Sequence, residues 1–226
     1  TLFPYTTLFR SRDILADSCL KWGQGKKRYD LIVGFPPMGL KVPTPNSLGI
    51  EWKSRTISMS DFFISKGADS LNPDGQLIAI APLSFLNSDG PTGALRRKLI
   101  DEGRINTIIQ LPAGLLYGSG LPVCVVIIND ESQKCDAVCL IDASEFSKKD
   151  RRLNILQVDE LLQAIDDSND NCVNVVSTHI IAKNDYKLLP SLYLSKGSDT
   201  VINIPDGFKV VSLKDIVTVV RGSKCE

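Results

Sequence analysis

Apolar residues in the middle of the chain gather into short uninterrupted runs separated by polar stretches. Runs of this length, bounded by charges or turn residues, are typical of strands buried in a sheet. The predicted strands are residues 29–35 (YDLIVGF), 76–86 (QLIAIAPLSFL) and 104–111 (RINTIIQL). The segments between them have apolar residues at helical spacing. This alternation of strand and helix predicts a parallel sheet with right-handed crossovers and helices on both faces.

The two predicted crossover helices lie within residues 58–76 and 93–103. In the first, Ser60 is the candidate N-cap and the turn sequence NPDG marks the end. Its apolar positions are Phe62, Phe63, Ala68 and Leu71. In the second, the apolar stripe consists of Leu95, Leu99 and Ile100. Both segments therefore have one face suited to packing on the sheet.

The connection after the third strand is too short for another crossover. Only about ten residues, rich in glycine and proline, separate residues 104–111 from the apolar run at 122–130. Because a parallel return needs a dozen or more residues, the run at 122–130 is predicted to be an antiparallel hairpin partner. Beyond it, residues 137–144 are expected to form an edge strand and residues 151–166 an amphipathic helix.

Composition and charge indicate a globular chain without a strong overall field. The 226 residues are 43% hydrophobic, and 26 basic side chains balance 26 acidic ones, so attraction to nucleic acid would come from local patches. The longest apolar stretch, residues 121–129, is far shorter than the ~20 residues that span a bilayer, and we expect no membrane contact. Six cysteines without zinc-site spacing indicate reduced thiols in a cytoplasmic protein.

Several of these segments together resemble a known family. The runs YDLIVGFPPMG, GQLIAIAPLSFL, LRRKLIDEGRINTIIQLPAGLLYGSGLPVCVVIIND and VCLIDASEF are similar to the modification subunit of type I restriction systems and to related DNA adenine methylases. The resemblance covers residues 13–194, and its most specific block is residues 111–129. It implies an α/β fold, namely the C-terminal half of a Rossmann-like methyltransferase sheet that is mostly parallel and ends in an antiparallel hairpin.

The resemblance implies a function for the corner after the first predicted strand. In the family this corner has the pattern Asn-Pro-Pro-(Tyr/Phe), and it receives an adenine flipped out of double-stranded DNA. The Asn amide oxygen and a backbone carbonyl accept the amine hydrogens, the prolines hold both acceptors rigid, and the aromatic ring stacks on the base. The corresponding residues here are Phe35, Pro36, Pro37 and Met38.

Two of these four positions depart from the family pattern. Phe35 offers no side-chain acceptor where an Asn is expected, and Met38 replaces the stacking aromatic. A missing hydrogen bond of this kind costs ~1–3 kcal/mol, or roughly ten- to 150-fold in rate. Two hypotheses stay open. One is an adenine-N6 methyltransferase that retains turnover, and the other is a non-catalytic member of the fold that binds DNA or partner subunits.

The resemblance also implies a cofactor and partners. The methyl donor of the family is S-adenosyl-L-methionine, held by a glycine-rich acidic loop upstream of the corner. The chain upstream is RDILADSCLKW, in which LADSCL resembles a cofactor-contacting block, so Asp17 is the candidate cofactor residue. Alternatively, Asp17 caps a turn. Without the loop, we expect this chain alone to bind the cofactor negligibly. The implied partners are specificity and restriction subunits or domains.

The chain is predicted to divide into four segments. Residues 1–11 match a translated sequencing adapter and are expected to be a non-native scar. Residues 12–146 are assigned to a partial methyltransferase catalytic domain, and residues 147–194 to a C-terminal helical extension. Residues 195–226 are expected to be a linker and the truncated start of a specificity-like, target-recognition domain, because FKVVSLKDIVTVVRG resembles the opening of one. Alternatively, this last stretch is a strand and helix of the methylase.

The remaining polar motifs have simple structural interpretations. KKR at residues 26–28 and RRK at residues 96–98 are expected to be solvated, and KKDRR at residues 148–152 to lie on the surface. YGSGLP at residues 117–122 is predicted to be a hairpin turn, since it does not join a strand to a helix as a phosphate-binding loop does. His179 is expected to be a surface or packing residue.

Overall fold

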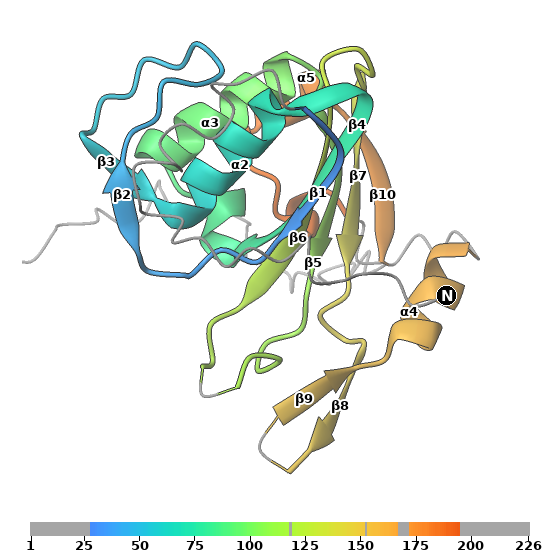
Figure 1. The fold of residues 1–226 in the computed structure, drawn as a ribbon. Helices are drawn as coiled ribbons and strands as arrows, with labels where there is room; N and C mark the ends of the chain where they lie inside the picture. The colour runs from blue at the N-terminus through green and yellow to red at the C-terminus, as the bar shows by residue number, and fades with distance from the viewer. Residues whose placement is uncertain (1–27, 118, 152, 167–171, 195–226) are drawn as a thin grey trace, which may run out of the picture. The chain divides into compact units, whose positions relative to one another are not determined.

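The computed structural model describes residues 28–117, 119–151, 153–166 and 172–194, which are drawn in colour in Figure 1. By its internal contacts the chain divides into two units, residues 1–195 and 196–226. Every described residue belongs to the first unit, so the fold given below is the fold of that unit.

A six-stranded sheet forms the centre of the fold, in the order β1-β4-β6-β5-β7-β10. The strands are β1 (Tyr29–Gly34), β4 (Leu71–Pro82), β5 (Ile105–Gln110), β6 (Val123–Asn129), β7 (Ala137–Asp142) and β10 (Val173–Ser177). β1, β4, β5 and β7 run in one direction, and β6 and β10 run in the other. The predicted antiparallel partner, β6, is confirmed and lies between β4 and β5. The predicted mostly parallel α/β fold is therefore confirmed.

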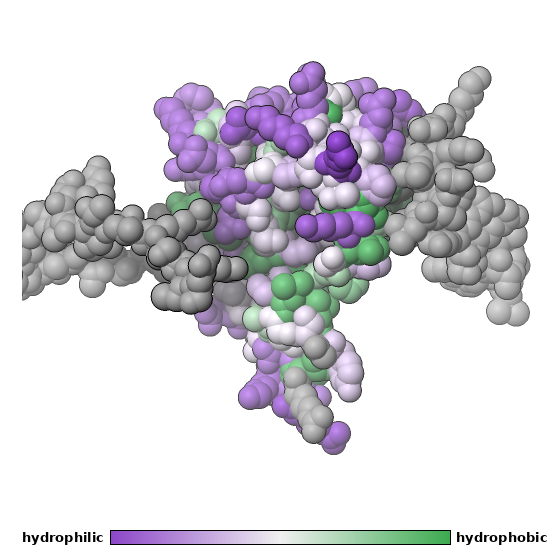
Figure 2. All heavy atoms as spheres, turned by 90° about the vertical axis from the view of Figure 1, so that its left-hand side faces the viewer, coloured by the Kyte–Doolittle hydropathy of each residue, from purple (hydrophilic) through white to green (hydrophobic). Residues whose placement is uncertain are grey.

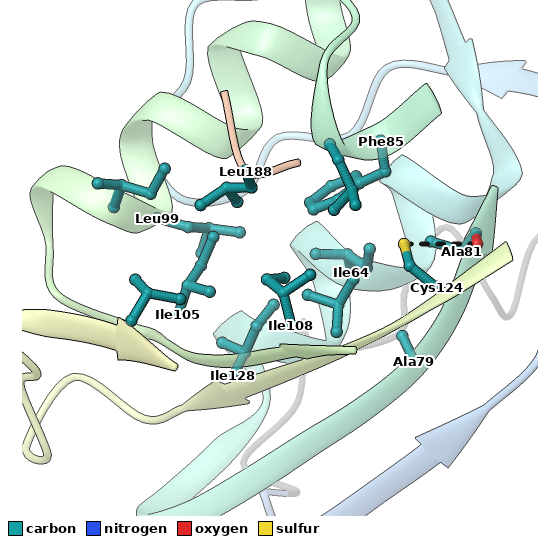
Figure 3. Close-up of a cluster of buried hydrophobic side chains, with 14 of the residues drawn as sticks. Ile64, Ala79, Ala81, Phe85, Leu99, Ile105, Ile108, Cys124, Ile128 and Leu188 are labelled. Carbon is teal, nitrogen blue, oxygen red and sulfur yellow. Dashed lines mark hydrogen bonds between the residues drawn. The ribbon is translucent and has the colours of Figure 1, made fainter. Parts of the chain in front are cut away.

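The crossover helices pack on one face of the sheet, where they close the main core (Figures 1 and 3). The helices on this face are α2 (Met59–Asp69), α3 (Gly90–Asp101) and α5 (Thr178–Lys183). Leu99, Ile108 and Leu188, which are distant in the sequence, meet in this core without exposed surface. The predicted stripe on α3 is confirmed, since Leu95 and Ile100 are buried beside Leu99.

The opposite face of the sheet is covered only in part. Helix α4 (Val158–Asp166) packs there through Leu161, which contacts the cluster around Ile141 and Ala143. At the β1 end of this face, the side chain of Val33 is 65% exposed. Helices therefore lie on both faces, as predicted, but the two crossover helices share one face. The physical reason is that both right-handed crossovers move along the sheet in the same sense, from β1 to β4 and from β4 to β5.

Helix α2 begins at a different serine from the predicted one. Ser58 Oγ accepts a hydrogen bond of 3.0 Å from the backbone N–H of Asp61, and the extended backbone of Ser58 is typical of an N-cap. Ser60, the predicted cap, is instead buried within the first turn. The predicted NPDG turn after α2 does not separate the helix from the strand, because β4 already begins at Leu71. This stretch instead forms a bulge within β4, in which Asp74 has φ 65°.

The chain after β7 contains more strand than the sequence indicates. Strands β8 (Ser147–Asp150) and β9 (Leu153–Leu156) pair as an antiparallel hairpin, so the helix predicted over residues 151–166 is wrong in its first part. Strand β7 is not an edge strand, because β10 pairs with it. The expected helical extension at residues 147–194 thus contributes a strand to the central sheet. The smaller elements are β2 (Lys41–Pro43), β3 (Thr56–Ser58), and the 3₁₀ helices η2 (Leu83–Leu86) and η3 (Pro190–Leu192).

The described cysteines are packing residues. Cys124, Cys135, Cys139 and Cys172 are all free thiols. Burial raises the pKa of Cys124 to about 12, so this thiol stays protonated and unreactive at neutral pH. Among the described residues, no group of His, Cys, Asp and Glu side chains is arranged to hold a metal ion. Within the same part of the chain, no helix has the length and apolarity needed to cross a bilayer.

Candidate functional site

The Pro-Pro corner lies at the carboxyl end of β1. Gly34 is the last residue of the strand and pairs with Ala79 of β4. Phe35 follows with 51% of its surface exposed, Pro36 is buried and Met38 is half-buried. Because β4, β5 and β7 run in the same direction as β1, their carboxyl ends lie at the same edge of the sheet. This is the edge at which ligands of open α/β sheets bind.

Two contacts hold the ends of the corner in place. At Gly34, an added Cβ atom would overlap the ring of Phe63, so the ring of this α2 residue occupies the space beside the glycine. At the other end, the backbone N–H of Met59 donates to the carbonyl oxygen of Leu40 at 2.8 Å. Leu40 also packs on the small cluster that β2, β3 and α2 bury together. The position of the corner therefore depends on the start of α2.

We expect Gly34→Ala to destabilise the protein by about 1–3 kcal/mol, because the new methyl group overlaps the Phe63 ring and forces β1 or α2 to move. Urea denaturation followed by circular dichroism measures the loss. Gly120→Ala is the matched control, since a Cβ at Gly120 meets nothing within 4 Å. Phe63→Leu in the Gly34→Ala background is expected to recover part of the loss. Equal free energies of unfolding for the two alanine variants would contradict the contact.

The side chains of the corner present an apolar surface. Phe35 has no hydrogen-bonding atom, and the thioether of Met38 is only a weak acceptor. The strong acceptor that remains is the backbone carbonyl of Phe35. Because Pro36 restricts Phe35 to extended conformations, the direction in which this carbonyl points is also restricted. Such a corner can hold a flat apolar face and accept one hydrogen bond, but it lacks the second acceptor of the family pattern.

The buried carboxylate at the start of α2 has a structural role. Asp61, in the first turn of α2, accepts a 2.8 Å hydrogen bond from Thr92 Oγ1 of α3 and so joins the two helices. Burial raises the pKa of Asp61, and the hydrogen bond from Thr92 opposes that shift. The hydrogen-bond partners of Asp61 are Thr92 of α3 and Ser58, the N-cap of α2. Because these bonds cap α2 and join it to α3, Asp61 is not assigned to the corner.

A cavity of about 540 Å³ lies against α3, and none of the corner residues lines it. Its walls come from α3, from residues 50–53 and from Asp185. The lining includes both bases, such as Arg97 and Lys98, and acids, such as Asp101. The charges balance, so the cavity selects no ligand by its overall charge.

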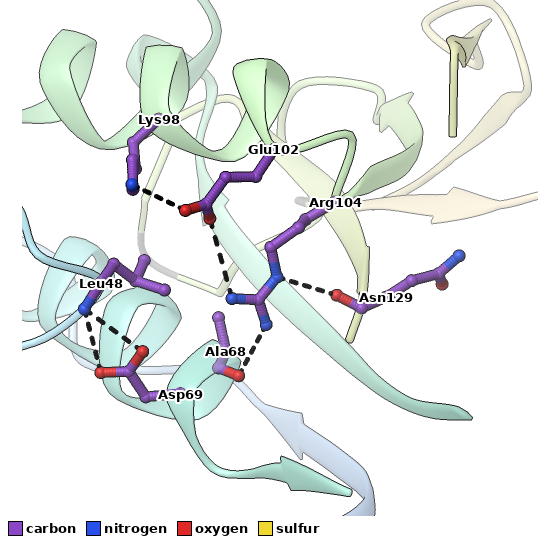
Figure 4. Close-up of polar contacts among 7 residues, drawn as sticks. All are labelled: Leu48, Ala68, Asp69, Lys98, Glu102, Arg104 and Asn129. Atoms are coloured by element: carbon purple, nitrogen blue, oxygen red, sulfur yellow. Dashed lines mark hydrogen bonds and ion pairs between the residues drawn. The ribbon is translucent and has the colours of Figure 1, made fainter. Parts of the chain in front are cut away.

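A polar cluster lies just before β5, at the amino ends of the parallel strands, whereas the corner lies at their carboxyl ends. Figure 4 shows the residues of this cluster. Arg104, just before β5, is buried and donates to the carbonyl oxygens of Ala68 at 2.7 Å and Asn129 at 3.2 Å. One carboxylate oxygen of Glu102 forms an ion pair with Arg104, and the other pairs with Lys98 at 2.7 Å. Because each group has a partner within the fold, this cluster closes the end of α2 onto β5 and β6.

The structure brings together four of the five predicted site residues. Phe35, Pro36, Pro37 and Met38 follow one another around the corner, whereas Asp17 lies outside the described residues. The sequence analysis missed the packing of Phe63 on Gly34. A glycine directly before a Pro-Pro corner is the one signal that could have indicated such a close approach.

The sheet order and the position of the corner define the class of protein. An antiparallel strand, β6, inserted between the parallel strands β4 and β5, with a Pro-Pro corner at the carboxyl end of the parallel strand β1, is the arrangement expected of a Rossmann-like methyltransferase domain. The N-6 DNA methylase family model matches residues 10–200. The chain therefore belongs to the N-6 DNA methylase family, as the sequence resemblance predicted.

Individual relatives agree with this assignment. The chain is 24% identical to the type I restriction enzyme MjaVIII methylase subunit of Methanocaldococcus jannaschii, over 76% of this chain and 33% of that relative. It is 22% identical to the MpnII methylase subunit of Mycoplasma pneumoniae, over 57% of this chain and 25% of that relative. The chain thus spans a third or less of the length of these curated relatives.

A solved structure supports the same fold. The crystal structure of the type I restriction-modification methyltransferase subunit from Streptococcus thermophilus is similar with a TM-score of 0.68 and 25% identity. The match covers 81% of this chain and 41% of that one. Most of the described fold is therefore shared with a type I modification subunit.

Proposed function

We propose that the polypeptide carrying this chain methylates N6 of adenine in double-stranded DNA as the modification component of a type I-like restriction-modification system. The observation that supports this most directly is the N-6 DNA methylase match over residues 10–200, together with the Pro-Pro corner at the carboxyl end of β1. Its partners would be specificity and restriction subunits or domains. In this proposal, residues 12–146 belong to the catalytic domain, residues 147–194 extend it, and residues 195–226 begin a specificity-like domain.

The proposed role of the corner is to hold a flipped adenine. S-adenosyl-L-methionine, when bound, supplies the methyl group. The carbonyl of Phe35 accepts one hydrogen of the adenine amine, and the rigid Pro36-Pro37 backbone keeps that carbonyl in place. The half-buried Met38 lies against the base face, as a thioether can. No described residue is assigned to the cofactor, and Asp17 is the proposed contact to its adenine.

A second function is favoured by the composition of the corner. Phe35 and Met38 remove the side-chain acceptor and the stacking ring that the family pattern provides. A non-catalytic member of the family would keep the fold in order to bind DNA or to assemble with partner subunits. This hypothesis predicts binding of DNA or of partner subunits without methyl transfer.

One experiment separates the two functions. The complete polypeptide that carries this sequence is incubated with tritiated S-adenosyl-L-methionine and unmethylated plasmid DNA, and N6-methyladenine is measured after digestion. The matched control is the same plasmid after full adenine methylation, which would accept no further label. Label in the unmethylated DNA alone supports the methyltransferase. Tight binding of the DNA or of a co-purifying partner subunit, with no label, supports the non-catalytic member. Absence of label, of DNA binding and of a bound subunit would refute both proposals.

A further inference from the structure

Two segments extend beyond the carboxyl ends of the strands and are joined to each other. They are the described residues of the β5–β6 connection, 111–117 and 119–122, and of the β8–β9 hairpin, 147–151 and 153–156, which we call the projection (Figure 1). Asn154 Nδ2 donates to the carbonyl oxygen of Ala113 at 2.7 Å, and the Asn154 N–H donates to that of Gly114 at 3.0 Å. Gly114 has φ +74°, a conformation that favours glycine. These bonds make the projection one unit.

The register of the hairpin separates its charges onto two faces. Lys149 pairs with Asn154, and Lys148 pairs with Ile155. Because paired residues share a face and side chains alternate along a strand, Lys149 lies on the face of Asn154, toward the β5–β6 connection. Lys148 and Asp150 lie together on the opposite face. On the opposite face, Asp150 partly cancels the charge of Lys148. On the face toward the connection, Lys149 has no acidic neighbour on the hairpin strands.

The tip of the connection adds an exposed aromatic ring. Tyr117 is 88% exposed, and Leu121 nearby is 41% exposed. Lys149 and Arg151 are also exposed, and within the described part of the chain neither forms an ion pair. Figure 2 shows hydrophobic and hydrophilic residues side by side on the part of the molecule that extends at the bottom of the view. Exposed cations and an exposed ring on the same projection suit a partner that offers both anionic oxygens and flat apolar surfaces.

We infer that the projection is a contact surface for duplex DNA, in which Lys149 and Arg151 bind phosphates and Tyr117 packs on the sugars or exposed bases. This inference rests on the proposed function, which brings DNA to the same edge of the sheet. A nucleic acid fits better than an acidic protein, because its phosphates and its apolar sugar and base faces alternate along one strand within a short distance.

The test measures the affinity of the complete polypeptide for a fluorescein-labelled duplex between 50 and 200 mM salt. We expect Lys149→Gln to reduce the slope of log affinity against log salt by about 0.9, the value for one phosphate contact. Tyr117→Ala is expected to weaken binding at least about fivefold with the slope unchanged. Lys148→Gln is the matched control, since it removes the same charge one residue away on the opposite face, and we expect its slope to equal that of the parent.

The outcomes distinguish this inference from the proposed function. A parent that methylates DNA, with Lys149→Gln and Tyr117→Ala binding the duplex as the parent does, overturns the projection as a DNA surface and leaves the proposed function intact. Equal slope changes in Lys148→Gln and Lys149→Gln also overturn it, because they would reflect net charge alone. A parent that binds no duplex overturns both. If Lys149→Gln or Tyr117→Ala lost a co-purifying protein subunit but kept the DNA affinity of the parent, the partner of the projection would be a protein instead.

Discussion

Phe35→Asn is expected to raise methyl transfer to adenine in duplex DNA by roughly ten- to a thousandfold. The substitution restores an amide oxygen beside a Pro-Pro backbone whose two ends are already held, by Phe63 at Gly34 and by Met59 at Leu40. Since Phe35 is 51% exposed and belongs to none of the buried hydrophobic clusters of the described residues, the change is not expected to unfold the protein. The gain is limited to the value of one buried hydrogen bond plus improved orientation of the amine.

The measurement is initial-rate tritium transfer by the complete polypeptide and its variant at matched cofactor occupancy. Met38→Phe is the companion variant, and we expect a smaller gain from it, because a ring restores stacking but does not orient the nitrogen lone pair. Thermal unfolding of each variant checks that the fold is unchanged. A parent that turns over at ordinary rates and is slowed by Phe35→Asn would show that the corner works through a different set of contacts.

The order of strands and helices was predictable because it depends on local patterns. The apolar run before the Pro-Pro corner, the stripe on α3 and the short β5–β6 connection each determine a local feature, and all three were predicted correctly. The hairpin β8–β9 was not. Its two strands are four residues each, and Asn154 is held there by a bond to Ala113, 41 residues earlier, which no local pattern reveals.

The side-chain environments were less predictable than the elements. The basic run at residues 96–98 predicts a solvated face, and this is wrong for Arg96, which is only 1% exposed. The next residue, Arg97, is exposed, as a solvated face requires. A charge run does not show which side chain points inward, because that depends on whether distant carbonyl groups need a donor. At the corner, the sequence identified the residues but not the Phe63 ring that fills the space beside Gly34.

The buried guanidinium of Arg96 joins two backbone segments that are distant in the sequence. Its Nη1 donates to the carbonyl oxygens of Phe85 at 2.7 Å and Ser88 at 3.0 Å, and its Nε donates to that of Tyr186 at 2.6 Å. Burial lowers the pKa of Arg96, which nevertheless stays charged because an arginine titrates far above neutral pH. Without it, three carbonyl groups around η2 and after α5 would lose their donor.

We therefore expect Arg96→Met to destabilise the protein by about 3–5 kcal/mol, the range for removing one member of a buried charged network. The matched control is Arg97→Met, one residue further along α3. Arg97 is exposed and only places its guanidinium 4.7 Å from the centre of the Tyr186 ring, an interaction worth about 0.5–1 kcal/mol. Urea denaturation monitored by circular dichroism gives both free energies of unfolding.

A second measurement locates the effect of Arg96. The Leu188 N–H donates to the Leu86 carbonyl at 2.8 Å, so this bond joins the same two segments that Arg96 holds together. In Arg96→Lys, which keeps the charge but has no planar fork, we expect hydrogen exchange at Leu188 to accelerate more than exchange at Ile108 in the centre of the sheet. Uniform acceleration at both amides, or equal destabilisation by Arg96→Met and Arg97→Met, would show that the buried guanidinium adds only packing volume.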